Sequence, residues 1–450
     1  MRQACASPQA HACAATGASR QAEGGGSLST SATEVYAYLG EADPPPGMLK
    51  HWAEALAARP VGGLPFLDVT SIPARRAACG LAPDADAGLL RVAQRIAEDE
   101  QLQTYAWFLF WRIFRDPEPG YMRPGPDLWP LLGELSGPFH QLIALEFAPA
   151  VERLHRSRGY PAEVTAATLA AVAGHDGNHR RGQGCPGSYS SQLPWLRMYV
   201  HEPYVRLGRL EFEITTFPHQ FTVWRQRHDR TVLMLAAEGV RVQADGLVLP
   251  DSADAASGWT TQVQHDSNSI TGHIVDPAGF IQRKTITLQT AAWELLAKQG
   301  DTILAMHIPP GGGMELQQCA DSYRRAVDFF TRYHPERQPK LIGCSTWFLD
   351  PRLSEILSAD ANPLRLQRCQ YLHPIRPLAS GGLWFVFLQR DLSNPQQLPR
   401  DSSLRRSLAD FLAAGKTWHG GGAFVPFDEA DDLREQRYRQ PFAQFSAANP

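Results

Sequence analysis

Residues that are able to transfer protons lie close to one glycine-rich segment of the chain. His307 stands near the end of the apolar run 302–308, directly before Pro309-Pro310-Gly311-Gly312-Gly313-Met314. A neutral imidazole is suited to act as a general base near neutral pH, which makes His307 a candidate catalytic residue. Glu213, on the polar side of an alternating run, is the nearest candidate carboxylate, and His273 is a second candidate histidine. The competing interpretation is structural: a histidine bonded to nearby backbone, and a glutamate that is only solvated.

The elements around His307 determine what chemistry the segment is able to perform. The run 302–308 is apolar on both faces, which predicts a central strand, and 315–333 predicts a helix. A helix that follows a strand presents unpaired backbone amides and the positive end of its dipole. Glycines between the two let a bulky anion approach the backbone closely. The pattern is typical of a site for the pyrophosphate of a nucleotide or of coenzyme A; the alternative is a tight turn between core elements.

Four other motifs fail on inspection. Gly182–Gly187 matches GxGxxG, but no strand precedes it and it contains a proline. The segment 414–417 ends like a Walker loop but lacks the leading glycine. The hydrolase motif GxSxG is absent, and Cys344 in the nearest similar stretch is expected to be a buried thiol rather than the nucleophile of a hydrolase. His175 and His179 lie among glycines, so we expect a solvated turn and no metal site.

Composition restricts the class of protein. The chain has 450 residues, with 43 Lys and Arg against 46 Asp and Glu, which gives a net charge of −3. A near-neutral chain lacks the positive charge of a nucleic-acid binder. No apolar run reaches the roughly 18 residues of a membrane span. The seven cysteines are scattered, as in a cytoplasmic protein with reduced thiols.

The pattern of elements divides the chain into five parts. We expect a disordered leader over 1–33, a helical domain over 34–173, a linker over 174–207, a strand-rich domain over 208–425 and a peripheral tail over 426–450. Within the fourth part, the pattern predicts a short helix over 290–298 and strands over 364–372 and 382–388. The fold class expected from this order is α+β.

Several stretches resemble a bacterial acyltransferase family whose members join a helical N-acyltransferase N-terminal domain to a GNAT-like C-terminal domain. The matching stretches are Gly208-Arg209-Leu210, Gly272-His273 with Gly279, Gly300-Asp301, His307-Ile308-Pro309 with its glycines, Ser322, Ala326, Phe329-Phe330, Tyr333, Pro335, Cys344 to Pro351, Asn362, Gln367 and Gly420-Gly421-Gly422. The resemblance covers about residues 35–425. It implies a mixed sheet with flanking helices, splayed beside the strand that ends near His307.

The resemblance also implies an activity. An acyl group would pass from acyl-coenzyme A, or a carrier thioester, to the amine or hydroxyl of a small-molecule acceptor by direct attack, with no metal and with neither nucleic acid nor membrane as partner. His307 would be the base, with Glu213 and then His273 as the other catalytic candidates. The donor would be held by Ile308, Pro310, Gly311, Gly312, Gly313 and Met314. The loop departs from the usual GNAT sequence, and the tyrosine often placed after Asp350 as proton donor is missing. Both departures favour the alternative, a non-catalytic ligand-binding or regulatory protein on the same scaffold.

Overall fold

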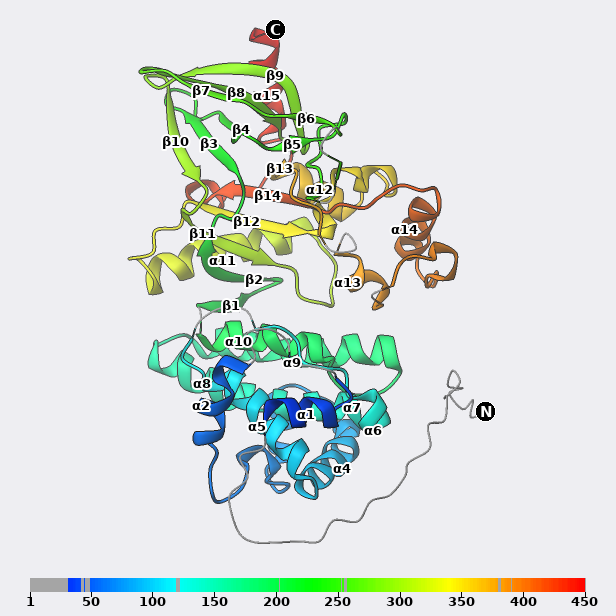
Figure 1. Ribbon diagram of the computed structural model, residues 1–450. Helices are drawn as coiled ribbons and strands as arrows, with labels where there is room; N and C mark the ends of the chain where they lie inside the picture. Colours follow the sequence, from blue (N-terminus) through cyan, green and yellow to red (C-terminus); the bar gives the residue numbers. More distant parts are fainter. Residues whose placement is uncertain are drawn as a thin grey trace.

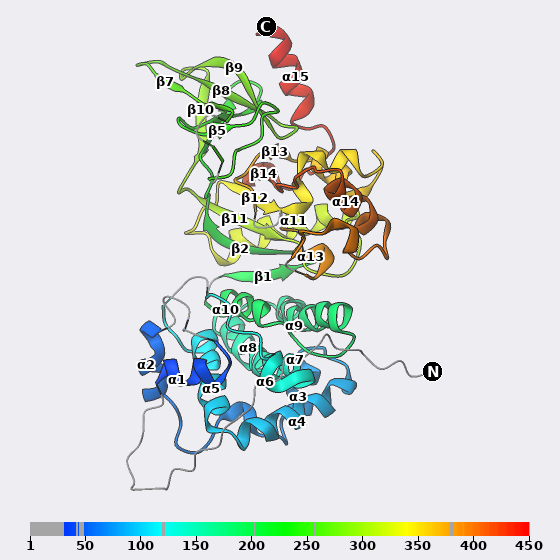
Figure 2. The same cartoon turned by 45° about the vertical axis from the view of Figure 1, so that its right-hand side comes forward.

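The computed structural model of the protein describes residues 31–41, 44, 49–118, 122–201, 203–251, 253–254, 257–378, 382–389 and 391–449. A helical half is followed by a half built on two β-sheets, and Figure 1 shows the two halves stacked on each other. Figures 1 and 2 agree that α9 and α10 form the layer of the helical half that faces strand β1. The part of the leader expected over 1–30 lies outside the described residues.

The helical half is organised around one buried helix, α5. Its aromatic residues make it apolar on nearly all sides, and the side chain of Asp99 caps its first turn by accepting hydrogen bonds from two backbone amides. The other helices pack around it in a single core. The helices are α1 (Ala32–Tyr38), α2 (Trp52–Ala57), α3 (Ile72–Ala78), α4 (Asp86–Ala97), α5 (Glu100–Phe114), α6 (Trp129–Leu132), α7 (Ser136–Ala144), α8 (Phe147–Ser157), α9 (Ala162–Gln183) and α10 (Leu193–His201).

Helix α9 corrects the expected linker. The loop predicted from Gly174 onward is wrong, because α9 continues as a helix of 22 residues to Gln183 and ends at Gly184 in the left-handed conformation. The glycines permit close packing instead of a turn. A methyl group at Gly182 would collide with the hydroxyl of Tyr189, and one at Gly174 would lie 2.8 Å from Cγ of Pro310. Of the predicted solvated pair, His179 is buried at 1% exposed.

The first sheet, sheet A, has six strands in the order β1-β2-β11-β12-β14-β13. The pair β11 and β12 is parallel and the other neighbours are antiparallel, so the sheet is mixed, as expected. Helix α11 (Leu316–Tyr333) packs its buried side, which includes Tyr323 and Phe330, on the apolar face. The strands are β1 (Tyr204–Leu207), β2 (Leu210–Thr216), β11 (Thr302–His307), β12 (Leu341–Thr346), β13 (Tyr371–His373) and β14 (Gly421–Pro426).

The second sheet, sheet B, is inserted between β2 and β11 and has the order β10-β3-β4-β8-β7, with β9 paired to β8. Its strands are β3 (Phe221–Gln226), β4 (Val232–Ala236), β7 (Val263–His265), β8 (Ser269–Asp276), β9 (Phe280–Gln289) and β10 (Trp293–Lys298). A short pair, β5 (Arg241–Val242) and β6 (Trp259–Thr260), lies beside it. The tail is not peripheral, since Phe442 of α15 (Arg439–Ala448) packs into the core of sheet B and Arg225 pairs with Asp428.

Three expected elements have the wrong type. The segment 290–298 forms strand β10, because Trp293 and Ala297 are buried where β10 pairs with β3. The segment 364–372 is divided between α12 (Asn362–Arg368), which has Pro363 in its first turn, and β13. The segment 382–388 contains α13 (Trp384–Phe387), and α14 (Ser403–Ala413) follows it as a helix. Apolar runs this short fit a strand and a helix equally well until their neighbours are known.

Two properties of the described residues bear on the class of protein. Among the helices that the structure describes, none combines the length and the apolar character of a membrane span. Among the cysteines of the described part of the chain, Cys79, Cys319, Cys344 and Cys369 are buried free thiols. Burial raises the pKa of the Cys344 thiol to about 12, as expected for an inert core residue.

Acid is expected to destabilise the helical half. Burial lowers the pKa of His140 and of His155 to about 4, and the two residues are 2% and 1% exposed. An imidazole in the unfolded chain titrates near pH 6.5. As the pH falls from about 6.5 toward 4, the unfolded chain therefore binds protons that the folded chain does not, and stability is lost across that window.

Urea unfolding at pH 7 and at pH 5 measures this loss. A tenfold difference in proton affinity between the folded and the unfolded chain is worth about 1.4 kcal/mol, so we expect each histidine to remove about 1 to 2 kcal/mol over that interval. The variant His155→Gln lacks one of the two titrating imidazoles and is therefore expected to lose less stability than the wild type between the two pH values. A free energy of unfolding that is the same at both would contradict the prediction.

Candidate active site

The two central parallel strands of sheet A separate at their carboxyl ends. Strand β11 pairs with β12 at only two positions, Leu304 with Ile342 and Ala305 with Gly343. Beyond them β11 continues to His307 beside β2, while β12 continues to Thr346 beside β14. The resulting wedge opens where β11 runs into the glycine loop. Ligands of such sheets bind outside the carboxyl ends of the strands, and the splay that the resemblance implies is present.

His307 and Glu213 meet on one face of sheet A. In the antiparallel register His307 lies opposite Glu211 and Ala305 lies opposite Glu213, so the histidine and both glutamates share a face. The Nε2 atom of His307 is 3.3 Å from Oε1 of Glu213. The imidazole stacks on Tyr204, with 5.1 Å between ring centroids, and meets the edge of Trp195 at 5.6 Å. These contacts fix the ring, and a proton on Nε2 bound by Glu213 makes Nδ1 the accepting nitrogen.

Glu213 is buried although it belongs to the polar side of its strand. Its side chain is 10% exposed and that of His307 is 27% exposed. The polar face of β2 is covered because α10 of the helical half packs over it: the hydroxyl of Tyr199 donates to Oε2 of Glu211 at 2.8 Å. The interpretation of Glu213 as a merely solvated side chain is therefore wrong. Glu213 instead lines a cavity between the helical half and sheet A.

Glu211 is a second buried carboxylate beside the pair. It is 5% exposed, and burial raises its pKa, an effect that the hydrogen bond from Tyr199 partly offsets. The hydroxyl of Tyr204 also approaches Oε2, at 3.4 Å. Glu211 therefore links Tyr199 of α10 to Tyr204, and the ring of Tyr204 in turn stacks on His307. Neither Glu211 nor Tyr204 is in a sequence motif; only the alternation of β2 placed Glu211 on the face of Glu213.

A cavity of about 490 Å³, here the interdomain cavity, contains both candidate residues. Its walls come from α10, β2 and the two ends of β11, so it lies between the helical half and sheet A. The lining residues are Trp195, Arg197, Met198, His201, Glu213, Ile214, Thr215, Thr216, Thr302, His307 and Arg337. The arrangement offers a held imidazole and a carboxylate to a molecule that enters between the two halves.

The glycine loop is fastened by Arg209. The guanidinium donates to the carbonyl oxygens of Pro309 and Gly313 at 2.9 Å each and of Gly312 at 3.4 Å. In a trans peptide the N–H points opposite to the carbonyl, so the amides of Gly313 and Met314 point away from Arg209. Gly311 and Gly312 have φ of +83° and +69°, a conformation that favours glycine. The side chain of Glu315 does not cap α11, whose first turn follows directly.

The remaining donor-binding candidates differ in exposure. Gly311, Gly312, Gly313 and Pro310 are exposed, Ile308 is half-buried, and Met314 is buried in the core at 7%. Met314 therefore offers its backbone rather than its side chain. The loop also touches the helical half, because Pro310 packs against Gly174 of α9. Within the described residues, no group of three histidine, cysteine, aspartate or glutamate side chains is placed to hold a metal ion.

His273 is not brought to this site. It lies on β8 of sheet B, where it pairs with Thr285, and its Nδ1 is 3.2 Å from the carbonyl oxygen of Gln282. Its ring packs on Trp259 at 4.8 Å. The structural interpretation of this histidine is the one its contacts favour. The residues that sequence reasoning did not assign to the site are Trp195, Tyr199, Tyr204 and the fastening Arg209, which stood in the sequence only as part of Gly208-Arg209-Leu210.

Two family models match the chain. One, described as an N-acyltransferase N-terminal domain, matches residues 71–201, and the other, described as a GNAT-like C-terminal domain, matches residues 204–425. The boundary between them falls between α10 and β1. No sequence among the curated proteins matches the chain.

Solved structures of similar fold include three acyltransferase crystal structures. One, a variant in complex with octanoyl-CoA, is 22% identical with a TM-score of 0.60. A second, in complex with CoA and 10C-teicoplanin, is 22% identical with a TM-score of 0.59, and a third, with decanoyl-CoA and teicoplanin, is 23% identical with a TM-score of 0.58. Each match covers 87% of this chain and 98% of the other. The chain belongs to the acyltransferase family that joins an N-acyltransferase N-terminal domain to a GNAT-like C-terminal domain.

Proposed function

We propose that this acyltransferase takes its acyl group from acyl-coenzyme A and transfers it to an amine or hydroxyl of a small molecule bound between its two halves. The observation that carries the proposal is the wedge between β11 and β12, which opens directly before the glycine loop and beside His307. The solved acyltransferases of similar fold are complexes with CoA, octanoyl-CoA or decanoyl-CoA, which supports a donor of this class. Two of them also contain teicoplanin or its derivative, which supports a small-molecule acceptor.

The donor is positioned by backbone groups. The amides of Gly313 and Met314 and the first turn of α11 hold the pyrophosphate, since they point away from Arg209 and lie at a positive helix end. The thioester arm enters the wedge, where β11 has no partner strand on its β12 side beyond Ala305. A backbone amide near His307 polarises the thioester carbonyl and stabilises the oxyanion that forms on attack.

The acceptor is activated by His307. An amine attacks only when uncharged, so Nδ1 of His307 takes its proton while Glu213, 3.3 Å from Nε2, stabilises the imidazolium. The new carbon–nitrogen or carbon–oxygen bond forms as the carbon–sulfur bond breaks, and coenzyme A leaves as the thiol after it receives a proton. Holding both reactants in one cavity supplies much of the rate by proximity. Acyl-coenzyme A is made and used in the cytoplasm, where we place the reaction.

Isothermal titration of the full chain with acetyl-, octanoyl- and decanoyl-coenzyme A tests the donor. We expect binding of at least one acyl-coenzyme A, and release of free thiol when an acceptor is added. A folded protein that binds none of the three would overturn the proposal. Binding of a donor without thiol release against a panel of amines and alcohols would favour the non-catalytic alternative instead.

Replacing Arg209 by glutamine is expected to weaken donor binding. The variant loses most of the three hydrogen bonds that hold the loop carbonyls, so the amides are no longer preorganised. We expect KM for acyl-coenzyme A to rise about tenfold with little change in kcat, which corresponds to about 1.4 kcal/mol of binding energy. Arg324→Gln is the matched control, since Arg324 is an exposed residue of α11 that pairs with Asp321 in the same helix. Equal KM values for the two variants would contradict the role of Arg209.

A further inference from the structure

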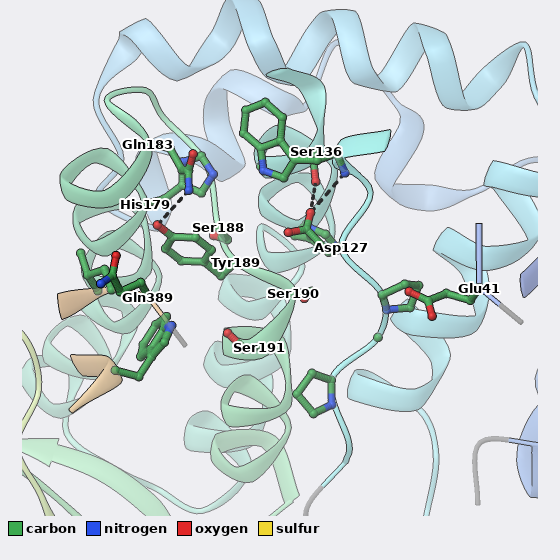
Figure 3. Close-up of a pocket in the computed structure, with 18 of the residues that line it drawn as sticks. Glu41, Asp127, Ser136, His179, Gln183, Ser188, Tyr189, Ser190, Ser191 and Gln389 are labelled. Carbon is green, nitrogen blue, oxygen red and sulfur yellow. Dashed lines mark hydrogen bonds between the residues drawn. The ribbon is translucent and has the colours of Figure 1, made fainter. Parts of the chain in front are cut away.

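A second cavity, of about 530 Å³, lies between the helical half and α13 (Figure 3). Its walls come from α7, α9, the segments 124–129 and 188–191, and the segment 384–389. We call it the α9–α13 cavity. It shares no lining residue with the interdomain cavity, which is lined by His307, so the two cavities are separate.

The lining of this cavity carries negative charge. Glu41 and Asp127 contribute carboxylates, and no lysine or arginine of the described chain is among the lining residues. Burial lowers the pKa of His140 to about 4 and also lowers the pKa of His179, so both imidazoles are neutral at pH 7. Asp127 is held in place, because its Oδ1 accepts from the hydroxyl of Ser136 and from the backbone N–H of Trp129, at 3.2 Å each. Two carboxylates without a basic partner favour a cationic ligand.

Two buried polar atoms of the lining have no partner. Nε2 of His140 and Oγ of Ser188 make no hydrogen bond with any described residue, and these residues are 2% and 0% exposed. Buried polar groups are paired in the great majority of cases, and an unpaired group at a cavity wall indicates that a ligand or water supplies the partner. The cavity therefore offers neutral hydrogen-bonding groups at its base and carboxylates nearer the surface, where Glu41 and Asp127 are exposed.

Aromatic rings form the rest of the wall. Trp384 meets Tyr189 edge to face, with 5.7 Å between ring centroids, and Trp129 lines the same cavity. Ring faces of this kind attract cations and pack against flat groups of a ligand. Figure 3 shows Tyr189 and Asp127 on different walls of the cavity, with Ser188 next to Tyr189 on the same segment.

The elements around the cavity reach both sides of the wedge. Helix α9 touches the loop after β11, since a methyl group at Gly174 would lie 2.8 Å from Cγ of Pro310. The segment before α13 touches the residue that follows β12, since a methyl group at Gly382 would lie 3.2 Å from Cβ of Trp347. A molecule in the cavity is thus bordered by two elements, one of which contacts the loop after β11 and the other the residue after β12.

We propose that the α9–α13 cavity is a recognition site for a protonated amine on the acceptor, with the ammonium group at one of the two carboxylates, Asp127 or Glu41, and an adjoining ring on Trp129 or Trp384. The proposal rests on the acyl-transfer function proposed above and narrows the acceptor to molecules that carry an ammonium group besides the group that is acylated. No covalent step occurs in the cavity.

Binding of two matched probe pairs to the full chain, without acyl-coenzyme A, tests this site. The probes are tyramine and tryptamine, each compared with its uncharged N-acetyl derivative by isothermal titration or saturation-transfer NMR. We expect at least one amine to bind about tenfold more tightly than its N-acetyl derivative. The double variant Asp127→Asn, Glu41→Gln is expected to abolish that preference, while Glu238→Gln, an exposed carboxylate beyond β4 of sheet B, keeps it.

Two results would overturn the proposal: no preference for either amine over its derivative, or a preference that survives the double variant. Circular dichroism of each variant ensures that a loss is not due to unfolding. Titration of the same samples with decanoyl-coenzyme A separates this site from the transfer reaction. If an amine binds more tightly than its N-acetyl derivative but decanoyl-coenzyme A does not bind, the proposed function is refuted and the amine site stands. If the donor binds and turns over but neither amine is preferred, only the amine site is refuted.

Discussion

Replacing His307 by alanine is expected to lower kcat for acyl transfer by about 10² to 10⁴, the range that a positioned general base contributes. The imidazole is held by Glu213 at 3.3 Å and by the ring of Tyr204, whereas His201, the other histidine that lines the interdomain cavity, has its Nε2 3.1 Å from the carbonyl oxygen of Ile113. Binding of acyl-coenzyme A is expected to stay within about twofold, because the loop that holds the donor is backbone fastened by Arg209. Single-turnover rates and donor titration measure the two effects separately.

Glu213→Gln and His273→Gln are the companion variants. The first keeps a hydrogen-bond acceptor near Nε2 but removes the charge that stabilises the imidazolium, so we expect an intermediate loss of kcat. The second changes a histidine whose contacts are Gln282 and Trp259 in sheet B, and we expect turnover to be unchanged. Full activity in His307→Ala, or a loss in His273→Gln as large as that in His307→Ala, would contradict the assignment of His307 as the general base.

Replacing Asp350 by alanine is expected to lower the free energy of unfolding by about 3 to 5 kcal/mol, the cost of breaking a buried charged network. The carboxylate is fully buried. Its Oδ2 accepts from the backbone amides of His419 at 2.9 Å and Gly420 at 3.1 Å, and its Oδ1 accepts from the backbone amide of Arg352 at 2.9 Å. Alanine leaves these donors buried without an acceptor. Urea unfolding gives the free energy directly.

The contacts of Asp350 hold the far wall of the wedge. It lies just after β12 and binds the residues just before β14, where a methyl group at Gly421 would collide with the carbonyl oxygen of Leu349. We therefore expect Asp350→Ala to lose donor binding along with stability. Asp350→Asn, which keeps one acceptor oxygen, is expected to lose less, and the exposed Asp360→Ala is expected to unfold like the wild type. Wild-type stability in Asp350→Ala would contradict the assigned role.

Local sequence pattern was sufficient for the elements that carry the donor loop. The apolar run 302–308 predicted the central strand β11, and the one-sided apolar pattern of 315–333 predicted α11, which begins one residue later. Both patterns extend over enough residues to define a period. Predictions for shorter segments were wrong: 290–298 and 382–388 carry too few turns or alternations to separate helix from strand.

The candidate site was only partly predictable for the same reason. Residue type selected His307 and Glu213 singly, and the pattern of β2 placed Glu213 on a polar face, but nothing in the sequence joined residues 94 positions apart. His273 matched as a type and lies in the other sheet. Arg209 was part of a matching triplet, yet its role depends on three carbonyls about 100 residues away.

By itself the sequence determined which segments alternate, which are apolar throughout, and where a glycine loop follows a strand. Those features depend on neighbours in the chain, whose spacing the backbone fixes. The tertiary structure alone decided that α10 buries the polar face of β2, that α9 runs straight through Gly174 to meet Pro310, and that β11 and β12 part after two paired positions. Each of these is a contact between distant segments, and such contacts are selected by packing and by the burial of paired polar groups, which local spacing does not encode.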